Sequence, residues 1–126
     1  RFIATAEARA HENYKHKIAR TNTAGTIVTR AHSGKTCRLI RNAFTDSWAG
    51  REAEIEPYPL QGINVGHPAS QKGRIEGDVE NGVLPAGQSS GLIDSVPSAG
   101  TVVRSVVKEA SAVLSNLAAG NRLAAE

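Results

Sequence analysis

The sequence predicts an α/β fold in which strands alternate with helices and the strands form a parallel sheet. A β-branched run of strand length, residues 26–29, lies between two segments that suit helices, 6–20 and 37–48. Apolar residues recur at helical spacing from Val102 to Leu117, with charged residues on the other face. Such an alternation is typical of βα units.

The first elements follow from local chemistry. Residues 2–4 are a short apolar stretch before Thr5, which we interpret as the end of a strand. The segment 6–20 contains no Gly or Pro, and Tyr14 and Ile18 share one helical face with Ala10. Lys15 then points away from that face.

The later segments differ in amino-acid composition. We expect a helix over 37–48, ended by Gly50. Glycines and prolines interrupt residues 56–82, which predicts an irregular, loop-rich insertion with one short helix near 69–75. Pro97 and Ser98 supply a helix start, so the terminal helix is expected over 98–119, followed by a frayed tail.

The chain has 126 residues, enough for one domain, and a formal net charge of +3. The basic excess lies in a run without an intervening acid, formed by Arg30, Lys35, Arg38 and Arg41. Base-stacking aromatic residues are not interleaved with this run, so we interpret it as a solvated face and expect no nucleic-acid partner.

Cysteine and hydropathy constrain the compartment. Cys37 is the single cysteine, which excludes an intrachain disulfide and fits a reducing, cytoplasmic setting. A buried, inert thiol is the default interpretation. Apolar runs fall short of the roughly 20 residues of a membrane span, so we expect no membrane partner. Oligomeric state is left open.

The best candidate for site chemistry is the stretch 86–91, Ala-Gly-Gln-Ser-Ser-Gly. Glycines allow a backbone to approach a phosphate or a flat ring closely, and a following helix would add its positive N-terminal end. A plain glycine-rich turn is the competing interpretation. The four histidines form no metal-binding pattern, and only His32, after the predicted strand, is a candidate functional histidine.

Four segments carry a family resemblance. RFIATAE at 1–7 resembles a GTRF-x-A-T-x-E segment, and TRAHSGK from residue 29, with the Arg, Arg-Asn and Phe that follow it up to residue 44, resembles T-x-x-x-S/T-G-[RK]-x-x-R-x-x-R-N-x-[FL]. PYPLQ at 57–61 and AGQSSGLI at 86–93 are similar to two further landmarks in the right order. Together they resemble the flavin-dependent nitronate monooxygenases.

The resemblance implies a TIM barrel with FMN as cofactor and oxidation of alkyl nitronates by O₂. The chain is then the carboxy-terminal portion of one barrel-type domain with part of an inserted, loop-rich segment, and Gly87, Gln88 and Ser89 are the expected FMN contacts. No catalytic residue and no metal ligand is assigned, because the family's catalytic histidine belongs to an A-G-H-x-G segment that none of the four histidines matches.

A TIM barrel needs about 250 residues and eight βα units. We therefore expect this chain to be part of a larger protein, inactive and unstable in isolation because its parallel sheet would have open edges. Two alternatives remain. One is an FMN-dependent enoyl-acyl-carrier-protein reductase of the same fold, which shares a G-Q-S-[AG]-G string. The other is a non-catalytic remnant or small binding module.

Overall fold

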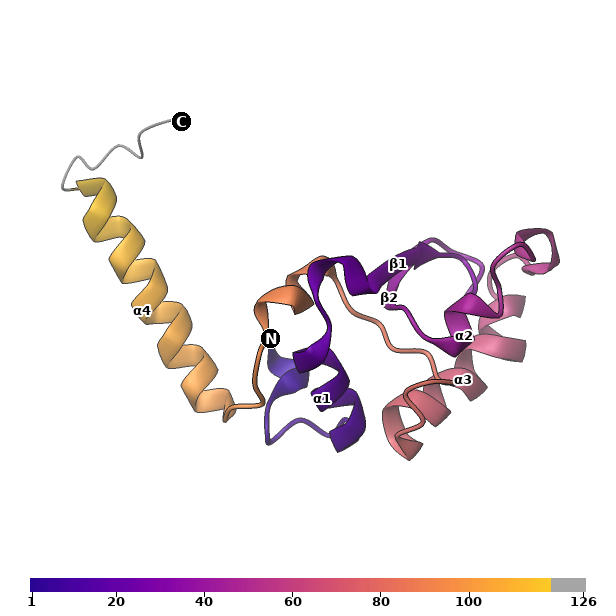
Figure 1. The fold of residues 1–126 in the computed structure, drawn as a ribbon, viewed down its shortest axis with the longest axis horizontal. Helices are drawn as coiled ribbons and strands as arrows, with labels where there is room; N and C mark the ends of the chain where they lie inside the picture. Colours follow the sequence, from indigo (N-terminus) through magenta and orange to yellow (C-terminus); the bar gives the residue numbers. More distant parts are fainter. Residues whose placement is uncertain (119–126) are drawn as a thin grey trace.

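A computed structural model of the chain describes residues 1–118, so the predicted last residue of the terminal helix and the tail lie outside the described residues. Short helical turns, two strands and four α-helices alternate along it (Figure 1). In order they are η1 Phe2–Ala4, α1 Glu12–Arg20, η2 Thr23–Gly25, β1 Thr26–Thr29, β2 Cys37–Ile40, α2 Ala43–Asp46, η3 Glu52–Glu54, η4 Gly62–Gly66, α3 His67–Gln71, η5 Lys72–Glu76, η6 Gln88–Leu92 and α4 Ala99–Ala118.

The elements form a body from which one helix projects. Figure 1 shows α1 at one end, α2 and α3 at the other, and the two strands between them. After η5 the chain runs back across the body to the N-terminal end, where η6 contacts both α1 and η2. α4 then extends away from the body.

The sheet has two antiparallel strands, with Thr26 opposite Ile40 and Thr29 opposite Cys37. The predicted β1 is confirmed, whereas the parallel sheet and a helix beginning at Cys37 are both wrong. The reason lies in two adjacent residues of β2, Leu39 and Ile40, which are both fully buried. Successive strand residues point to opposite faces, and these two enter separate core clusters. A segment buried on both sides has no alternating pattern to reveal it as a strand.

The N-terminal segment also differs from the prediction. Residues 2–4 form a 3₁₀ turn rather than a strand end, closed by the Ala4 N–H donating to the Arg1 carbonyl at 3.1 Å. The helix expected over 6–20 begins only at Glu12, because His11 caps it: the His11 ring Nδ1 accepts from the Asn13 N–H at 3.1 Å.

Within α1, Tyr14 and Ile18 enter the core as expected. Lys15, predicted to point outward, is instead buried with 1% of its surface exposed. Its ammonium donates to the Ala6 carbonyl at 3.1 Å and to Glu12 Oε1 at 2.7 Å. Burial of a lysine is tolerated when its donors are satisfied in this way. Lys15 therefore ties the loop before α1 to the helix.

The segment 56–82 is more helical than its composition predicts, and the short helix expected near 69–75 lies within a longer helical run. Helical turns follow one another without interruption through η4, α3 and η5, from Gly62 to Glu76. Gly66 lies so close to the His32 carbonyl that any side chain there would overlap it. Pro68, which has no N–H, follows the π-helical turn η4, where the bonding departs from the regular α-helical pattern. Residues that resembled helix breakers thus lie within the helical run.

The predicted terminal helix is confirmed as α4, and Ser98 starts it by accepting the Thr101 N–H at 3.2 Å. Polar contacts join α4 to the N-terminal segment: Glu7 accepts the Ala99 N–H at its base at 2.8 Å, and Arg1 pairs with Glu109, midway along the helix, at 3.2 Å. Its apolar residues beyond Val102 are largely exposed, namely Val103, Val106, Val107, Val113, Leu114 and Leu117.

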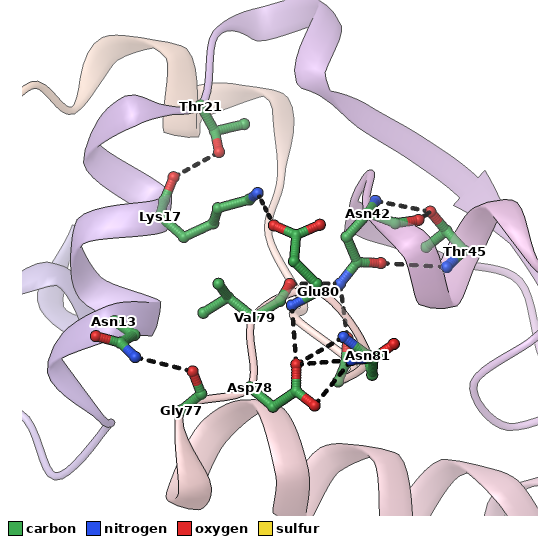
Figure 2. A network of polar contacts seen from close by, with 11 residues as sticks. Asn13, Lys17, Thr21, Asn42, Thr45, Gly77, Asp78, Val79, Glu80 and Asn81 are labelled. Atoms are coloured by element: carbon green, nitrogen blue, oxygen red, sulfur yellow. Dashed lines mark hydrogen bonds and ion pairs between the residues drawn. The ribbon is translucent and has the colours of Figure 1, made fainter.

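A polar network joins α1, the turn after η5 and the start of α2 (Figure 2). Asn42 is its centre: its side-chain oxygen accepts the Thr45 N–H at 3.1 Å, and its Nδ2 donates to the carbonyls of Val79 and Gly82, both at 2.8 Å. Because Asn42 is buried, these partners cannot be replaced by water.

Replacing Asn42 with alanine should reduce the free energy of unfolding by about 3 kcal/mol, since a helix cap and two buried hydrogen bonds are lost together. Asn64→Ala is the matched control, because Asn64 makes one exposed hydrogen bond to Glu56. It should cost no more than about 0.5 kcal/mol. Guanidinium unfolding of the full-length gene product measures both. Equal losses for the two variants would contradict the role assigned to Asn42.

Candidate functional site

The candidate site lies where the returning chain meets β2. The Ile40 N–H donates to the Leu84 carbonyl at 2.9 Å, and the Ala86 N–H donates to the Arg38 carbonyl at 3.3 Å. The Tyr14 hydroxyl adds a bond to the Pro85 carbonyl at 2.6 Å. The backbone immediately before Gly87 is therefore fixed from two sides, by β2 and by α1.

At Gly87 the chain turns into η6. The first bond of this turn runs from the Ser90 N–H to the Gly87 carbonyl at 3.0 Å, which leaves the preceding N–H groups without a partner inside the turn. The prediction that a helix directly follows the glycine-rich stretch and adds its positive N-terminal end is wrong. η6 is a 3₁₀ turn of five residues, and the long helix begins only at Ala99.

The two glycines of the motif have different surroundings. A side chain at Gly91 would overlap the backbone of Thr23, with its Cβ 2.6 Å from the Thr23 nitrogen. A Cβ at Gly87 would meet only the Ser89 hydroxyl, at 3.7 Å. Gly91 thus permits the close packing of η6 against η2, whereas Gly87 faces open space.

That open space is a cavity of about 240 Å³ between the motif and the N-terminal turn. Gly87 and Ser89 line it together with Ile3 and Ile18, while Gln88 does not. The structure therefore brings two of the three predicted contact residues to one cavity and leaves Gln88 exposed beside it. Arg1 is the only charged residue among the described residues that line the cavity.

Ser90 is a lining residue that sequence reasoning did not identify. Its surface is 3% exposed, and its hydroxyl has no hydrogen-bond partner within residues 1–118. The motif offered two adjacent serines, and only the turn geometry separates the exposed Ser89 from the buried Ser90. A buried hydroxyl without a partner is unusual in a folded protein.

His32 lies away from this cavity. Its ring is half-buried, with Nε2 3.3 Å from the Ser70 hydroxyl. Burial lowers the pKa of His32, and the neighbouring His67 and Arg74 lower it further, so the neutral ring predominates at pH 7. Its contacts to Ser70 and Gly66 are those of a packing residue. Within residues 1–118, the acids, histidines and cysteine form no group of three that could hold a metal.

Each of the four residues of the basic run contacts a group of the protein. Arg30 donates to the Gly34 carbonyl, Arg38 to the Thr26 hydroxyl and Arg41 to Asp46, whereas Lys35 lies 3.8 Å above the Tyr58 ring. These contacts support the interpretation of a solvated face. Each exposed pair adds little stability.

The single cysteine and the hydropathy of the helices can now be described. Cys37 is half-buried with its sulfur 3.6 Å from the Thr29 carbonyl, and burial raises the pKa of its thiol. The thiolate is therefore disfavoured, which suits an unreactive residue. Among the helices of residues 1–118, none combines the length and hydropathy required to cross a bilayer.

Solved structures share this backbone arrangement. FabK from Thermotoga maritima superposes with a TM-score of 0.80 at 30% identity, over 94% of this chain and 37% of FabK. The nitroalkane oxidase from Streptomyces ansochromogenes superposes with a TM-score of 0.76 at 25% identity, over 92% of this chain and 32% of the oxidase. The fold of this chain is therefore shared with part of FabK and part of a nitroalkane oxidase.

The family follows from the sequence comparison. The nitronate monooxygenase family model matches residues 1–109, and the chain belongs to this family. Probable nitronate monooxygenases of Staphylococcus saprophyticus and Staphylococcus aureus are 29% and 28% identical over 113 residues, which is 90% of this chain. The chain spans 31% of the length of each.

Alkaline pH should weaken the anchoring of the site through Tyr14. Burial raises the pKa of its hydroxyl from the ordinary 10.0 to about 12. Between these values the unfolded chain loses the proton while folded Tyr14 keeps it, so stability present below pH 10 is lost as the pH rises toward 12. Tyr14→Phe should cost about 1 kcal/mol at pH 7 and should remove part of this alkaline decline.

Chemical unfolding of the full-length gene product between pH 7 and 11 checks this expectation. Tyr58→Phe is the control, because the Tyr58 ring is 58% exposed. The control should retain the alkaline decline of the parent protein. A decline that is identical in the Tyr14 and Tyr58 variants would contradict the assignment.

Gly91 and Gly87 provide a matched pair of positions for substitution by alanine. Gly91→Ala should destabilise the protein by about 1–3 kcal/mol, because its methyl group overlaps the Thr23 backbone. Gly87→Ala should leave the stability of the apoprotein within about 0.5 kcal/mol, since its φ of −82° suits any residue and space is available. Thermal unfolding without added ligand distinguishes them, and equal destabilisation would refute the division of roles.

Proposed function

We propose that this chain serves an FMN-dependent oxidoreductase that oxidises alkyl nitronates with O₂ in the cytoplasm, as the carboxy-terminal portion of its TIM-barrel-type domain. The observation that carries the proposal is the family match over residues 1–109, which includes the glycine-rich segment lining the cavity. The similarity to a nitroalkane oxidase supports the same substrate class.

Gly87, Gln88 and Ser89 are the proposed FMN contacts. The site suits such a group in three respects: open space at Gly87, N–H groups of the turn that point to no partner within it, and a lining without an acid among the described residues. At about 240 Å³ the cavity is smaller than the roughly 300 Å³ of the smallest whole-ligand pockets. It suits one part of a cofactor.

The residues of this chain then bind FMN and position it. When bound, FMN supplies the electron transfer between substrate and O₂. The hydrogen bonds that join the segment before Gly87 to the Tyr14 hydroxyl and to the Arg38 carbonyl hold the proposed cofactor contacts in place. No histidine lines the cavity within residues 1–118, so the proposed contribution of this chain is cofactor binding rather than proton abstraction.

A second candidate is an FMN-dependent enoyl-acyl-carrier-protein reductase. The observation that favours it is the TM-score of 0.80 to FabK, which is no lower than the 0.76 to the nitroalkane oxidase. The backbone therefore does not separate the two activities, because one fold can support several chemistries.

The full-length gene product should purify as a yellow flavoprotein that releases FMN on denaturation. With propyl nitronate it should consume O₂, and with NADH and a crotonyl thioester it should show no turnover. The opposite substrate preference would establish the reductase. A colourless full-length protein that takes up no added FMN would refute both.

A further inference from the structure

A second cavity, of about 500 Å³, adjoins the proposed cofactor cavity. Phe2, Ile3 and Pro85 line both cavities, so a molecule in the second one lies next to any group held at the glycine-rich turn. Its volume falls in the range of pockets that hold a whole small ligand, whereas the cofactor cavity suits only part of one. The second cavity therefore has the place and the size of a substrate site.

The lining of this cavity combines apolar side chains with two guanidinium groups. Phe2, Ile3 and Ile75 are large apolar residues of the lining, and all three are exposed. Arg9 and Arg74 supply the charge, and no acid is among the described lining residues. Apolar surface beside two positive charges fits a ligand that has an aliphatic part and a negative charge.

Neither guanidinium is neutralised by an acid of the described chain. Within residues 1–118, ion pairs join other arginines to carboxylates, as between Arg41 and Asp46. None of these pairs includes Arg9 or Arg74, and both side chains are exposed. A nitronate carries its charge on two oxygens, as a carboxylate does, and a planar guanidinium can bond to both oxygens at once.

Hydrogen bonds hold the two segments that carry these arginines against each other. Arg9 lies in the loop before α1, and Arg74 lies in η5. The His11 N–H donates to the Arg74 carbonyl at 2.9 Å. Asn13 Nδ2 donates to the Gly77 carbonyl at 3.0 Å, a contact visible in Figure 2. The backbones of both segments are therefore placed before a ligand binds, which reduces the entropy cost of binding.

We propose that Arg9 and Arg74 bind the charged group of the substrate, so that this cavity prefers a nitronate over the neutral nitroalkane with the same carbon chain. The aliphatic part of the substrate then packs against the apolar lining, next to the proposed cofactor site. This inference rests on the proposed function, because it takes the substrate to be an alkyl nitronate.

Glutamine substitutions in the full-length protein test the two arginines. Arg9→Gln and Arg74→Gln should each raise KM for propyl nitronate about tenfold, as expected for the loss of one bond to a charged group. The kcat should stay within about twofold, because the charge is bound equally in the ground state and the transition state. Arg74→Lys keeps the charge and should restore most of the affinity. Arg20→Gln is the matched control, since Arg20 is exposed and does not line this cavity.

Binding of butanoate measures charge recognition without turnover. Butanoate has nearly the size of propyl nitronate and the same charge, and butanamide is its neutral counterpart. Calorimetric titration of the full-length protein should show that butanoate binds at least about tenfold more tightly than butanamide. Either glutamine variant should remove most of this preference, and the Arg20 control should retain it.

The possible outcomes distinguish this inference from the proposed function. A wild-type protein that does not oxidise propyl nitronate refutes the proposed function, and with it the assignment of a nitronate to this cavity. If the wild-type protein oxidises propyl nitronate but shows no preference for butanoate, the inference alone is refuted. Glutamine variants that behave as the Arg20 control does would also refute it alone. Loss of the butanoate preference in both variants, with recovery in Arg74→Lys, supports it.

Discussion

The pairing of the returning chain with β2 is the constraint on which the rest of the structure depends. Leu39 and Ile40 enter opposite core clusters, so β2 divides the interior into two halves. Leu84, from the returning chain, bonds Ile40 and packs in the same cluster as Tyr14. Because Gly87 follows three residues after Leu84 in the sequence, the core also determines where the glycine-rich turn begins.

This arrangement explains why only part of the fold follows from the sequence. The β-branched composition identified β1, and the helical spacing of apolar residues identified α4 and the inward face of Tyr14 and Ile18, because these signals lie within each segment. It failed at β2, which is buried on both sides, and at Lys15, whose burial depends on acceptors from Ala6 and Glu12. Contacts made by residues distant in sequence leave no local pattern.

The candidate site shows the same limit on a smaller scale. The glycine-rich string directed attention to Gly87 and Ser89, which line one cavity, and their role as cofactor contacts stays a prediction. It could not separate Gly87 from Gly91, because the difference lies in Thr23, which approaches Gly91 from another turn. Nor could it identify Ser90, whose burial arises only when η6 packs against η2 and α1.

The polar links around the N-terminal turn couple the cavity to α4. Lys15 holds the Ala6 carbonyl, and the Ala6 N–H in turn donates to the Pro97 carbonyl at 3.0 Å. The adjacent Glu7 caps the first turn of α4, where a carboxylate is favoured by the helix dipole. The loop between η1 and α1 therefore fixes the base of α4 relative to the wall that carries Ile3. A helix with a mostly exposed apolar face thus keeps a defined origin through hydrogen bonds and charge, together with the burial of Val102 in its first turn.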